Sequence, residues 1–178
     1  AWKVNIRYSA EPPGALETAG GIARALPLLG DGAFLVINGD VFCDIDFARF
    51  FGSTAIAHLV MIDNPAHHAG GDFGLADDRV VFAAAGRPTF TYAGVGIFSP
   101  EFFRDVPVGQ PLKLRPLLDT AIAAGTLTGE RFAGRWVDAD SGATFPVVNP
   151  ATGATVAEVP RMGAAETRRA IEAADRAL

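Results

Sequence analysis

The sequence predicts an α/β protein that carries a separate β-hairpin and helix at its C-terminal end. Short apolar runs of strand length alternate with helix-type segments through about the first 140 residues. Two of these runs, AFLVIN at 33–38 and IAHLVMI at 56–62, are almost continuously apolar, which is typical of parallel strands buried on both faces. Beyond position 138, a turn that contains Pro and Gly separates two strand-type segments, as in a hairpin, and an Ala-rich helix pattern follows. We therefore expect a mainly parallel sheet followed by a distinct tail.

Local signals define the elements of the first part. The predicted strands are short apolar or β-branched runs bounded by turn residues, at 4–8, 33–38, 56–62, 79–82, 89–98, 126–132 and 135–138. The predicted helices have helix-type apolar spacing or end at Gly or Pro, and they cover 16–28, 46–51 and 111–124. Residues 63–74 are rich in Asn, Pro, His and Gly, so we expect a loop there.

The tail has signals of its own. Residues 141–160 predict a two-stranded hairpin whose turn is the Asn-Pro-Ala-Thr-Gly segment at 149–153. Residues 164–178 predict a helix with an apolar stripe at Ile171, Ala174 and Leu178. Burial of these few side chains contributes little free energy compared with the conformational entropy that the tail loses when it becomes ordered. We therefore expect a loosely attached tail.

Composition limits the function classes. The chain has 178 residues, 49% of them hydrophobic, and a net charge of -5. That acidic balance argues against sequence-independent nucleic-acid binding, which needs a basic face. The single cysteine, Cys43, excludes a disulfide framework and a cysteine-only zinc site. We see no apolar run of about 20 residues and no signal segment, so we expect a cytoplasmic protein that does not bind membranes. The chain runs from Ala1 to Leu178 without an initial Met, and we expect a fragment.

A carboxylate that follows a buried strand is the first candidate for chemistry. Asn38, Gly39 and Asp40 come at the end of the predicted strand 33–38, and ligands of open α/β sheets bind at the carboxyl ends of strands. Mg²⁺ is usually held by one or two carboxylates together with substrate phosphates. An ordinary Asn-Gly-Asp turn explains the same residues. Asp138, after strand 135–138, is either a second carboxylate for such a site or a solvated strand end.

Two further patterns are weaker. Glu17, Gly20 and Gly21 lie in ETAGG at a helix start, where a glycine pair leaves backbone N–H groups available and lets a base or phosphate approach closely. The pair His67-His68 lacks a third ligand at a zinc spacing, and adjacent strand residues point to opposite faces. We therefore favour a loop near a substrate pocket over a metal site there.

Eight segments together resemble one enzyme family, the sugar-phosphate nucleotidyltransferases. In order they are IRYSAEP (6–12), LETAGGI (16–22), ALPLLGD (25–31), LVINGDVFCDIDF (35–47), DNPAHHAGGDF (63–73), TYAGVGIFSP (91–100), LKLRPLL (112–118) and GERFAGRWVD (129–138). The resemblance covers about residues 2–138. It is strongest to the uridylyltransferase branch of bacterial cell-wall recycling, whose sugar substrate is N-acetylmuramate 1-phosphate.

The resemblance implies a fold, a reaction and a set of site residues. The fold would be a Rossmann-like nucleotidyltransferase three-layer sandwich lacking its first strand. The reaction would transfer a uridylyl group from UTP to a sugar 1-phosphate with Mg²⁺ as the cofactor. No side chain is assigned a catalytic role. The implied sites are Asp40 and Asp138 for the metal, Glu17, Gly20, Gly21, Asn38 and Gly39 for the nucleotide, and Gly94 and Gly96 for the sugar.

Two departures from the family pattern lower the expected activity. The family's Gly-rich, Arg-containing loop, which cradles the triphosphate, has no counterpart in this sequence. The residues after W-x-D are Ala-Asp-Ser-Gly instead of Gly-Thr. We therefore expect little or no turnover.

The tail resembles a different family, the aldehyde dehydrogenases. Residues 136–178 are similar to the N-terminal hairpin and first helix of NAD(P)-dependent succinate-semialdehyde dehydrogenases, and the two resemblances overlap at 134–138. We expect a nucleotidyltransferase-like domain at 1–138 and a dehydrogenase-like tail at 139–178. Two alternatives stay open, an N-terminal fragment of a dehydrogenase and a non-catalytic chimeric fragment.

Overall fold

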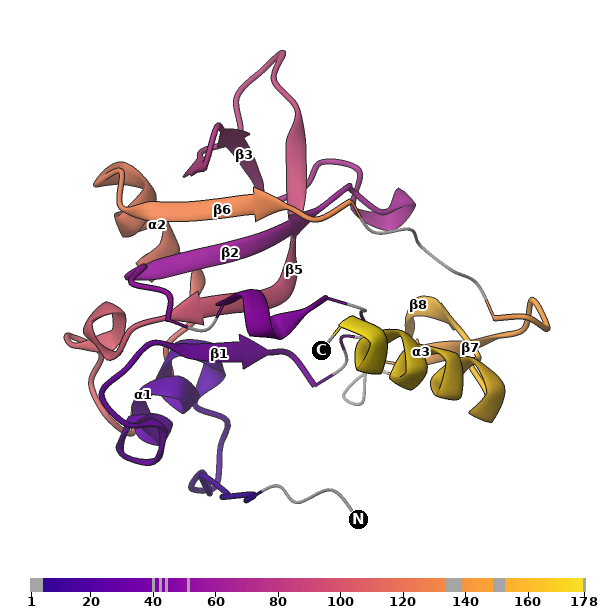
Figure 1. Cartoon of the computed structure of the whole chain (residues 1–178), viewed down its shortest axis with the longest axis horizontal. Coiled ribbons are helices and arrows are strands. Elements are labelled where there is room, and N and C mark those ends of the chain that lie inside the picture. The colour runs from indigo at the N-terminus through magenta and orange to yellow at the C-terminus, as the bar shows by residue number, and fades with distance from the viewer. Residues whose placement is uncertain are drawn as a thin grey trace. The chain divides into compact units, whose positions relative to one another are not determined.

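The computed structural model describes residues 5–39, 41, 43, 45–50, 52–133, 139–148 and 153–177 (Figure 1). The chain forms two compact units. Unit 1 consists of Ala1–Val41 and Gly52–Ala133, and unit 2 consists of Phe42–Phe51 and Gly134–Leu178. The domain boundary expected between 138 and 139 stays a prediction. Within the described ranges, no helix is long and apolar enough to cross a membrane.

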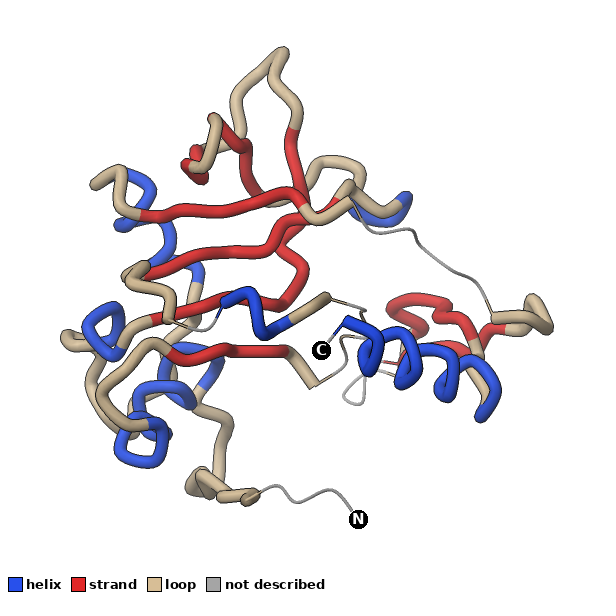
Figure 2. Tube along the Cα trace, viewed as in Figure 1, coloured by secondary structure: helices blue, strands red, loops and turns tan. Residues whose placement is uncertain are grey.

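Unit 1 alternates strands with helices, as Figure 2 shows in red and blue. Its elements are α1 (Glu17–Leu29), β1 (Phe34–Ile37), β2 (Ala57–Ile62), η2 (Ala66–His68), β3 (Phe73–Ala76), β4 (Arg79–Val81), β5 (Thr89–Phe98), η3 (Pro100–Phe103), α2 (Arg115–Ala123) and β6 (Leu127–Arg131). The matching helices and strands predicted from the sequence are confirmed. The strand β3 and the single turns η2 and η3 were not predicted. The loop predicted at 63–74 is therefore wrong for η2 and for the first two residues of β3, because turn-forming residues surround both.

The sheet of unit 1 is mixed, so the expectation of a mainly parallel sheet is wrong. Its strand order is β1-β5-β2-β6-β4-β3. Strand β5 lies between β1 and β2 and is antiparallel to both, and β2–β6 is the parallel pair. Strands β1, β2 and β6 do run in one direction, as strand–helix alternation suggests. The ten-residue β5 returns from the β3–β4 hairpin between β1 and β2 and separates them.

Strand β5 is irregular at Gly94. Leu59 pairs with Gly96 and Met61 pairs with Tyr92, so two steps along β2 correspond to four along β5. Gly94 lies inside this bulge with φ +73, a conformation that glycine adopts without strain. Bulges re-aim strands and are common beside binding sites.

The core of unit 1 lies between the sheet and its two long helices, α1 and α2, which lie behind the sheet in Figure 1. Ala19 and Ala23 of α1 and Leu118 of α2 pack with Leu59 and Met61 of β2. Two layers of the predicted three-layer sandwich are thus present within unit 1. The third layer and the expected lack of a first strand stay predictions.

The strand predicted at 4–8 is wrong for residues 5–8, which have no regular structure. A strand is stable only when its backbone groups pair with a neighbour, and no described strand lies beside this segment. Its apolar side chains are consequently solvent-exposed, 66% for Ile6 and 86% for Tyr8. The strand predicted at 135–138 lies outside the described residues.

Unit 2 contains η1 (Phe47–Phe50), β7 (Thr144–Val148), β8 (Thr155–Pro160) and α3 (Ala164–Ala177). The antiparallel pairing of β7 with β8 confirms the predicted hairpin, although positions 149–152 of its turn lie outside the described residues. The side chains of the predicted stripe Ile171, Ala174 and Leu178 also lie outside the described part. Cys43, in the same unit, is half-buried.

Polar contacts tie the first turn of α3 to the segment that precedes β7. Glu166 accepts hydrogen bonds from the backbone N–H groups of Asp140 (3.1 Å) and Gly163 (3.0 Å). The backbone N–H of Glu166 itself, followed by those of Asp140 and Gly163, holds the pKa of the Glu166 carboxyl below its usual value. Arg169 forms an ion pair with Asp140 at 2.7 Å. The start of the helix therefore caps itself in the manner of a capping box.

Candidate functional site

The candidate site lies at the edge of the sheet where β1, β2 and β6 end and β5 begins, called here the carboxyl edge (Figure 1). Asn38 and Gly39 follow β1, Asp63 and Asn64 follow β2, and Thr89 opens β5. Because β1 and β2 are parallel, their carboxyl ends meet at one edge, as the sequence reasoning required. Asn38 and Gly39 are both solvent-exposed, so a ligand can approach the backbone after β1.

Asn38 and Gly94 are in direct contact at this edge. The Asn38 N–H donates to the carbonyl oxygen of Gly94 at 2.8 Å, and the Val41 N–H donates to the carbonyl oxygen of Asn38 at 3.1 Å. A Cβ at position 94 would lie 2.8 Å from Asn38 Nδ2 and 2.9 Å from Val41 Cγ2. The bulge in β5 thus fits closely against the segment that follows β1. The structure brings together one residue expected at the nucleotide and one expected at the sugar.

The two expected metal ligands, Asp40 and Asp138, lie outside the described residues. Among the described residues, no group of three His, Cys, Asp or Glu side chains could hold a metal ion. Within the described part of the chain, His67 and His68 belong to no such group. The metal assignment to Asp40 and Asp138 therefore stays a prediction.

The glycine pair of α1 has a packing role that the sequence did not reveal. The backbone N–H groups of Ala19 and Gly20 both donate to the carbonyl oxygen of Leu112, at 2.9 and 3.2 Å. A Cβ on Gly20 would lie only 2.3 Å from the carbonyl oxygen of Gln110. The expectation that Gly20 offers an available N–H is therefore wrong, because the loop before α2 occupies that place. The nucleotide-binding role assigned to Gly20 stays a prediction.

Glu17 and Gly21 lie on either side of this contact. Glu17 is exposed and has φ +58, an unusual conformation for a residue with a side chain. A Cβ on Gly21 would meet the Glu11 carboxylate at 2.7 Å, and the same carboxylate accepts a hydrogen bond from the Leu16 N–H at 2.8 Å. Glu11, which sequence reasoning missed, thus fixes the entry into α1.

Gly96 lies within the sheet and not at its edge. It is buried and pairs with Val36 on one side and Leu59 on the other. A Cβ there would meet the Phe98 ring at 2.9 Å and the His58 carbonyl oxygen at 3.2 Å. Close packing therefore explains this glycine, and its expected contact with a sugar stays a prediction.

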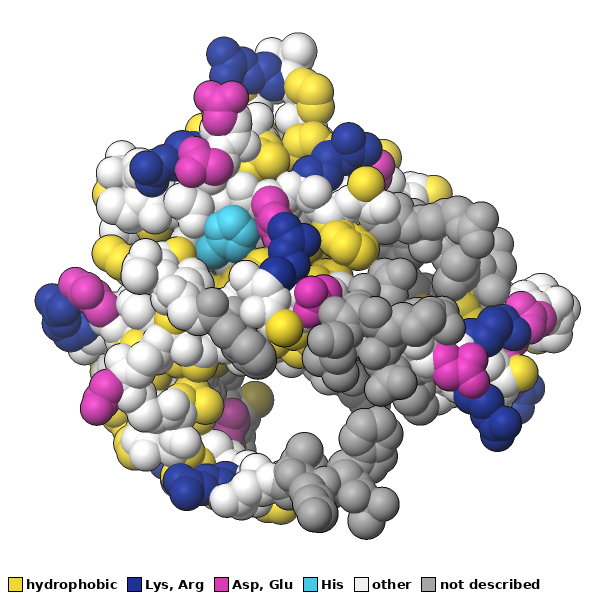
Figure 3. Space-filling view, in the orientation of Figure 1, with side chains coloured by type: hydrophobic (Ala, Val, Ile, Leu, Met, Phe, Trp, Pro, Cys, Tyr) yellow, Lys and Arg dark blue, Asp and Glu magenta, His cyan; other side chains and the backbone are white. Residues whose placement is uncertain are grey.

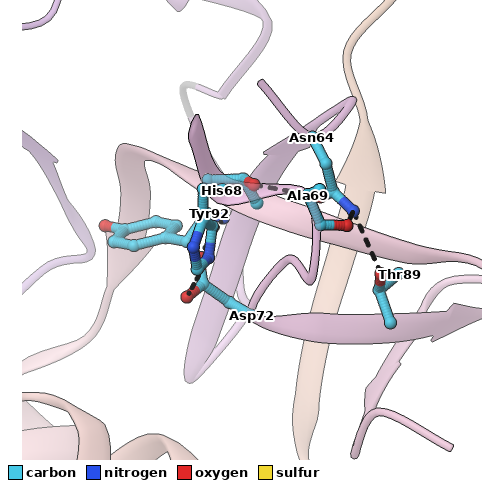
Figure 4. Close-up of polar contacts among 7 residues, drawn as sticks. Asn64, His68, Ala69, Asp72, Thr89 and Tyr92 are labelled. Carbon is cyan, nitrogen blue, oxygen red and sulfur yellow. Dashed lines mark hydrogen bonds and ion pairs between the residues drawn. The ribbon is translucent and has the colours of Figure 1, made fainter. Parts of the chain in front are cut away.

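The loop after β2 is ordered by a polar network (Figure 4). Asn64 Nδ2 donates to the carbonyl oxygen of Ala69 at 3.1 Å and to Thr89 Oγ1 at 3.0 Å, and Thr91 Oγ1 donates to Asn64 Oδ1 at 3.0 Å. Asp72 accepts a hydrogen bond from the Tyr92 N–H at 2.9 Å, and its other oxygen lies 3.2 Å from His68 Nε2. Sequence reasoning missed Asn64 and Asp72, since each resembles an ordinary turn residue.

The phenol of Tyr92 is buried in the same region. Its hydroxyl oxygen has no hydrogen-bond partner among the described residues. Burial raises the pKa of the Tyr92 hydroxyl, because the charged form would lose its hydration. Tyr92 therefore stays neutral, and it packs against the core of unit 1.

A bidentate ion pair closes the end of β2 against the end of β6. Arg131 donates from Nε to Asp63 Oδ1 at 2.8 Å and from Nη2 to Asp63 Oδ2 at 2.6 Å, and its guanidinium lies over the Phe90 ring at 5.7 Å. The hydrogen bonds from Arg131 lower the pKa of Asp63 and raise that of Arg131. On the face shown in Figure 3, acidic and basic side chains of the described residues are interspersed.

Replacing Asp63 with Asn should make the melting temperature fall less steeply as the solution becomes acidic. A carboxyl whose pKa is lowered by folding stabilises the protein above its ordinary value of 3.8, and this contribution disappears as the pH falls through the folded pKa. The parent should therefore lose melting temperature more steeply than Asp63→Asn as the pH falls below 3.8. The pair is exposed, so the difference should be small and should shrink in high salt. Melting curves between neutral and strongly acidic pH measure it, and parallel profiles would contradict it.

Comparison with solved structures identifies the fold. The inositol-1-phosphate CTP transferase from T. maritima matches 72% of this chain and 58% of its own, with a TM-score of 0.54 and 13% sequence identity. HddC from Yersinia pseudotuberculosis matches 71% of this chain, with a TM-score of 0.53. The fold is thus the Rossmann-like nucleotidyltransferase fold.

Comparison with known sequences confirms both resemblances. Over 145 residues, 78% of this chain, the sequence is 45% identical to N-acetylmuramate alpha-1-phosphate uridylyltransferase of Neisseria meningitidis. The chain spans 63% of that relative's length. The pattern of the aldehyde dehydrogenase family matches residues 136–178. The chain is also 71% identical to glutarate-semialdehyde dehydrogenase of Pseudomonas aeruginosa over 45 residues. Those 45 residues are 25% of this chain and 9% of that relative.

Proposed function

We propose that the nucleotidyltransferase-like part of the chain, residues 1–138, binds UTP and a sugar 1-phosphate and transfers the uridylyl group between them. The observation that carries the proposal is the 45% identity to the Neisseria meningitidis uridylyltransferase over 78% of the chain. The nucleotidyltransferase fold and the exposed backbone of Asn38 and Gly39 at the carboxyl edge support it. We propose N-acetylmuramate 1-phosphate as the sugar substrate on the strength of that relative's name.

The reaction needs positioning and charge neutralisation more than acid–base catalysis. An oxygen of the sugar 1-phosphate bonds to the α-phosphorus of UTP, and the bond between the α- and β-phosphates breaks to release pyrophosphate. The exposed Asn38-Gly39 backbone lets the nucleotide lie close to the chain, and the contact with Gly94 holds Asn38 in place. We propose that this arrangement orients the two substrates.

Asp40 and Asp138 are the residues that we propose hold Mg²⁺. Two carboxylates together with substrate phosphates are a donor set that this ion accepts. The exposed end of β1 directly before Asp40 leaves room for such phosphates. When bound, the ion neutralises negative charge on the triphosphate.

Replacing Asp40 with Asn should remove the response to nucleotide. We expect UTP with Mg²⁺ to raise the melting temperature of the parent but not of Asp40→Asn, because the neutral amide is a much poorer ligand for Mg²⁺. Whatever pyrophosphate the parent releases from UTP and N-acetylmuramate 1-phosphate, the rate in Asp40→Asn should be lower by about a hundredfold or more, the usual scale for losing electrostatic stabilisation.

The matched control is Asp105→Asn, which removes an exposed carboxylate after η3. It should behave like the parent in both assays. The proposal fails if the parent shows neither a UTP-dependent shift nor pyrophosphate release. The rate of pyrophosphate release by the parent also measures whether turnover is as low as the sequence leads us to expect.

A dehydrogenase function is the weaker candidate. The tail resemblance covers 25% of this chain and 9% of the Pseudomonas aeruginosa relative. We therefore assign no catalytic residue to the tail and propose no role for it in uridylyl transfer.

A further inference from the structure

The pair His68 and Asp72 forms a small half-buried site at the surface, where an ion pair adds little stability. His68 Nε2 lies 3.2 Å from Asp72 Oδ1, and the two side chains are 43% and 30% exposed. Exposed ion pairs of this kind contribute little to folding. A carboxylate can only accept hydrogen bonds, so the contact requires a proton on Nε2 of His68, which donates the hydrogen bond to Asp72 Oδ1. Nδ1 of His68 is then the ring nitrogen that does not contact Asp72.

The surroundings hold this pair in one geometry. The second oxygen of Asp72 accepts the Tyr92 N–H at 2.9 Å, and the Asp72 N–H donates to the Phe90 carbonyl oxygen at 2.8 Å. Asn64 ties the other side of the loop to Ala69 and Thr89 (Figure 4). An exposed imidazole supported by hydrogen bonds of its partner is the arrangement that binding sites use to preorganise a side chain.

The pair belongs to the carboxyl edge. Tyr92, which anchors Asp72, is two residues before Gly94, where β5 bulges against Asn38. In Figure 1, η2, which contains His68, lies at the end of the sheet where β2 and β6 finish. His68 is therefore on the same edge as the proposed nucleotide segment.

The chemistry of uridylyl transfer leaves no need for His68 as a base. The nucleophile is a phosphate oxygen, and a phosphate monoester is already largely ionised at neutral pH. A histidine at this edge is therefore better suited to binding. A histidine that carries a proton on each ring nitrogen can donate a charge-assisted hydrogen bond from Nδ1 to an anion. Arg131, a cation at the same edge, already uses Nε and Nη2 for Asp63.

We propose that His68, held by Asp72, recognises a carboxylate on the sugar 1-phosphate and so selects acidic sugars. This inference rests on the proposed function, and it adds the residue that determines substrate choice. N-acetylmuramate carries a lactyl carboxylate that N-acetylglucosamine lacks. The two sugar 1-phosphates therefore differ in the group to which His68 would donate a hydrogen bond. Asp72 acts as a positioning residue.

The test compares the dissociation constants of these two sugar 1-phosphates by titration calorimetry on the full chain. We expect the parent to prefer N-acetylmuramate 1-phosphate. His68→Ala should weaken binding of the acidic sugar about tenfold, the typical loss for a charge-assisted hydrogen bond, and leave N-acetylglucosamine 1-phosphate unaffected. The matched control is His67→Ala, which removes the exposed neighbouring imidazole and should change neither constant.

Asp72 provides a second readout. Asp72→Asn can still accept the Tyr92 N–H but loses the charge that faces His68, so it should weaken binding of the acidic sugar less than His68→Ala does. A purely structural role for Asp72 would change both sugars equally. A parent that binds the two sugars equally, or a loss in His68→Ala that is the same for both, overturns the proposal.

This outcome is separable from failure of the proposed function. The UTP-dependent melting shift does not involve the sugar. A chain with a His68-dependent preference but no response to UTP would support carboxylate recognition and contradict uridylyl transfer. A chain that responds to UTP but binds the two sugars equally would support uridylyl transfer and contradict carboxylate recognition by His68.

Discussion

Gly20→Ala should lower the melting temperature of the protein by several degrees. The new Cβ would lie 2.3 Å from the carbonyl oxygen of Gln110 and 3.3 Å from the Leu112 nitrogen, both backbone atoms that cannot rotate away. Relieving that overlap must displace the loop before α2 and weaken the hydrogen bonds that Leu112 accepts from Ala19 and Gly20. Overpacking of this kind costs about 1–3 kcal/mol, which exceeds the gain of up to about 1 kcal/mol in helix propensity. Thermal melts measure the net effect.

Gly21→Ala is the matched control, one residue further along the same helix. Its Cβ would meet the end of the Glu11 side chain, which is flexible but accepts a hydrogen bond from the Leu16 N–H. The gain in helix propensity should offset most of the cost of weakening that bond, so the melting temperature should change much less than in Gly20→Ala. Equal destabilisation by both substitutions would show that the packing of Gly20 against the Gln110 backbone is not what matters.

Gly94→Ala should damage both stability and the proposed nucleotide response. Position 94 has φ +73, where a side chain costs about 1–2 kcal/mol, and its Cβ would overlap Asn38 and Val41. With the overlap added, we expect a loss of about 2–4 kcal/mol in the free energy of unfolding. Because the overlap displaces the segment after β1, the melting shift produced by UTP with Mg²⁺ should also shrink at temperatures where the variant is folded.

Gly109→Ala separates the two causes. Gly109 has φ +84 but nothing within 4 Å of its would-be Cβ, so only the conformational cost applies. We expect a loss of about 1–2 kcal/mol and an unchanged response to UTP. If Gly94→Ala and Gly109→Ala behave alike, the contact between the β5 bulge and Asn38 has no part in the site.

The distribution of correct and incorrect predictions has a physical basis. Strand β5 was predicted with the bounds that it has, Thr89–Phe98, because its apolar and aromatic residues form a long run between breakers. Its direction and neighbours could not be predicted, since hydrophobic periodicity records burial and not strand order. Residues 5–8 have the composition of a strand but no described neighbour, and composition cannot supply a hydrogen-bonding partner.

The candidate site divides in the same way. The motif around Asn38 and Gly39 could be placed at a strand end from the sequence, because an apolar run followed by Asn-Gly-Asp is a local pattern. The contact between Asn38 and Gly94 joins residues 56 positions apart through a bulge, and no local pattern encodes it. The support that Asp72 gives to His68 is close in sequence, but it depends on the Tyr92 N–H of a strand that folds back from elsewhere.

The sequence by itself determined the alternation of strands and helices, the hairpin and helix of the tail, and the two family resemblances, because each of these is carried by spacing and residue type along the chain. Only the tertiary structure decided that β5 separates β1 from β2, that Gly20 serves packing, and that His68 is held by Asp72. Those features arise where distant segments compete for the same space and the same hydrogen-bonding groups, which a linear pattern does not record.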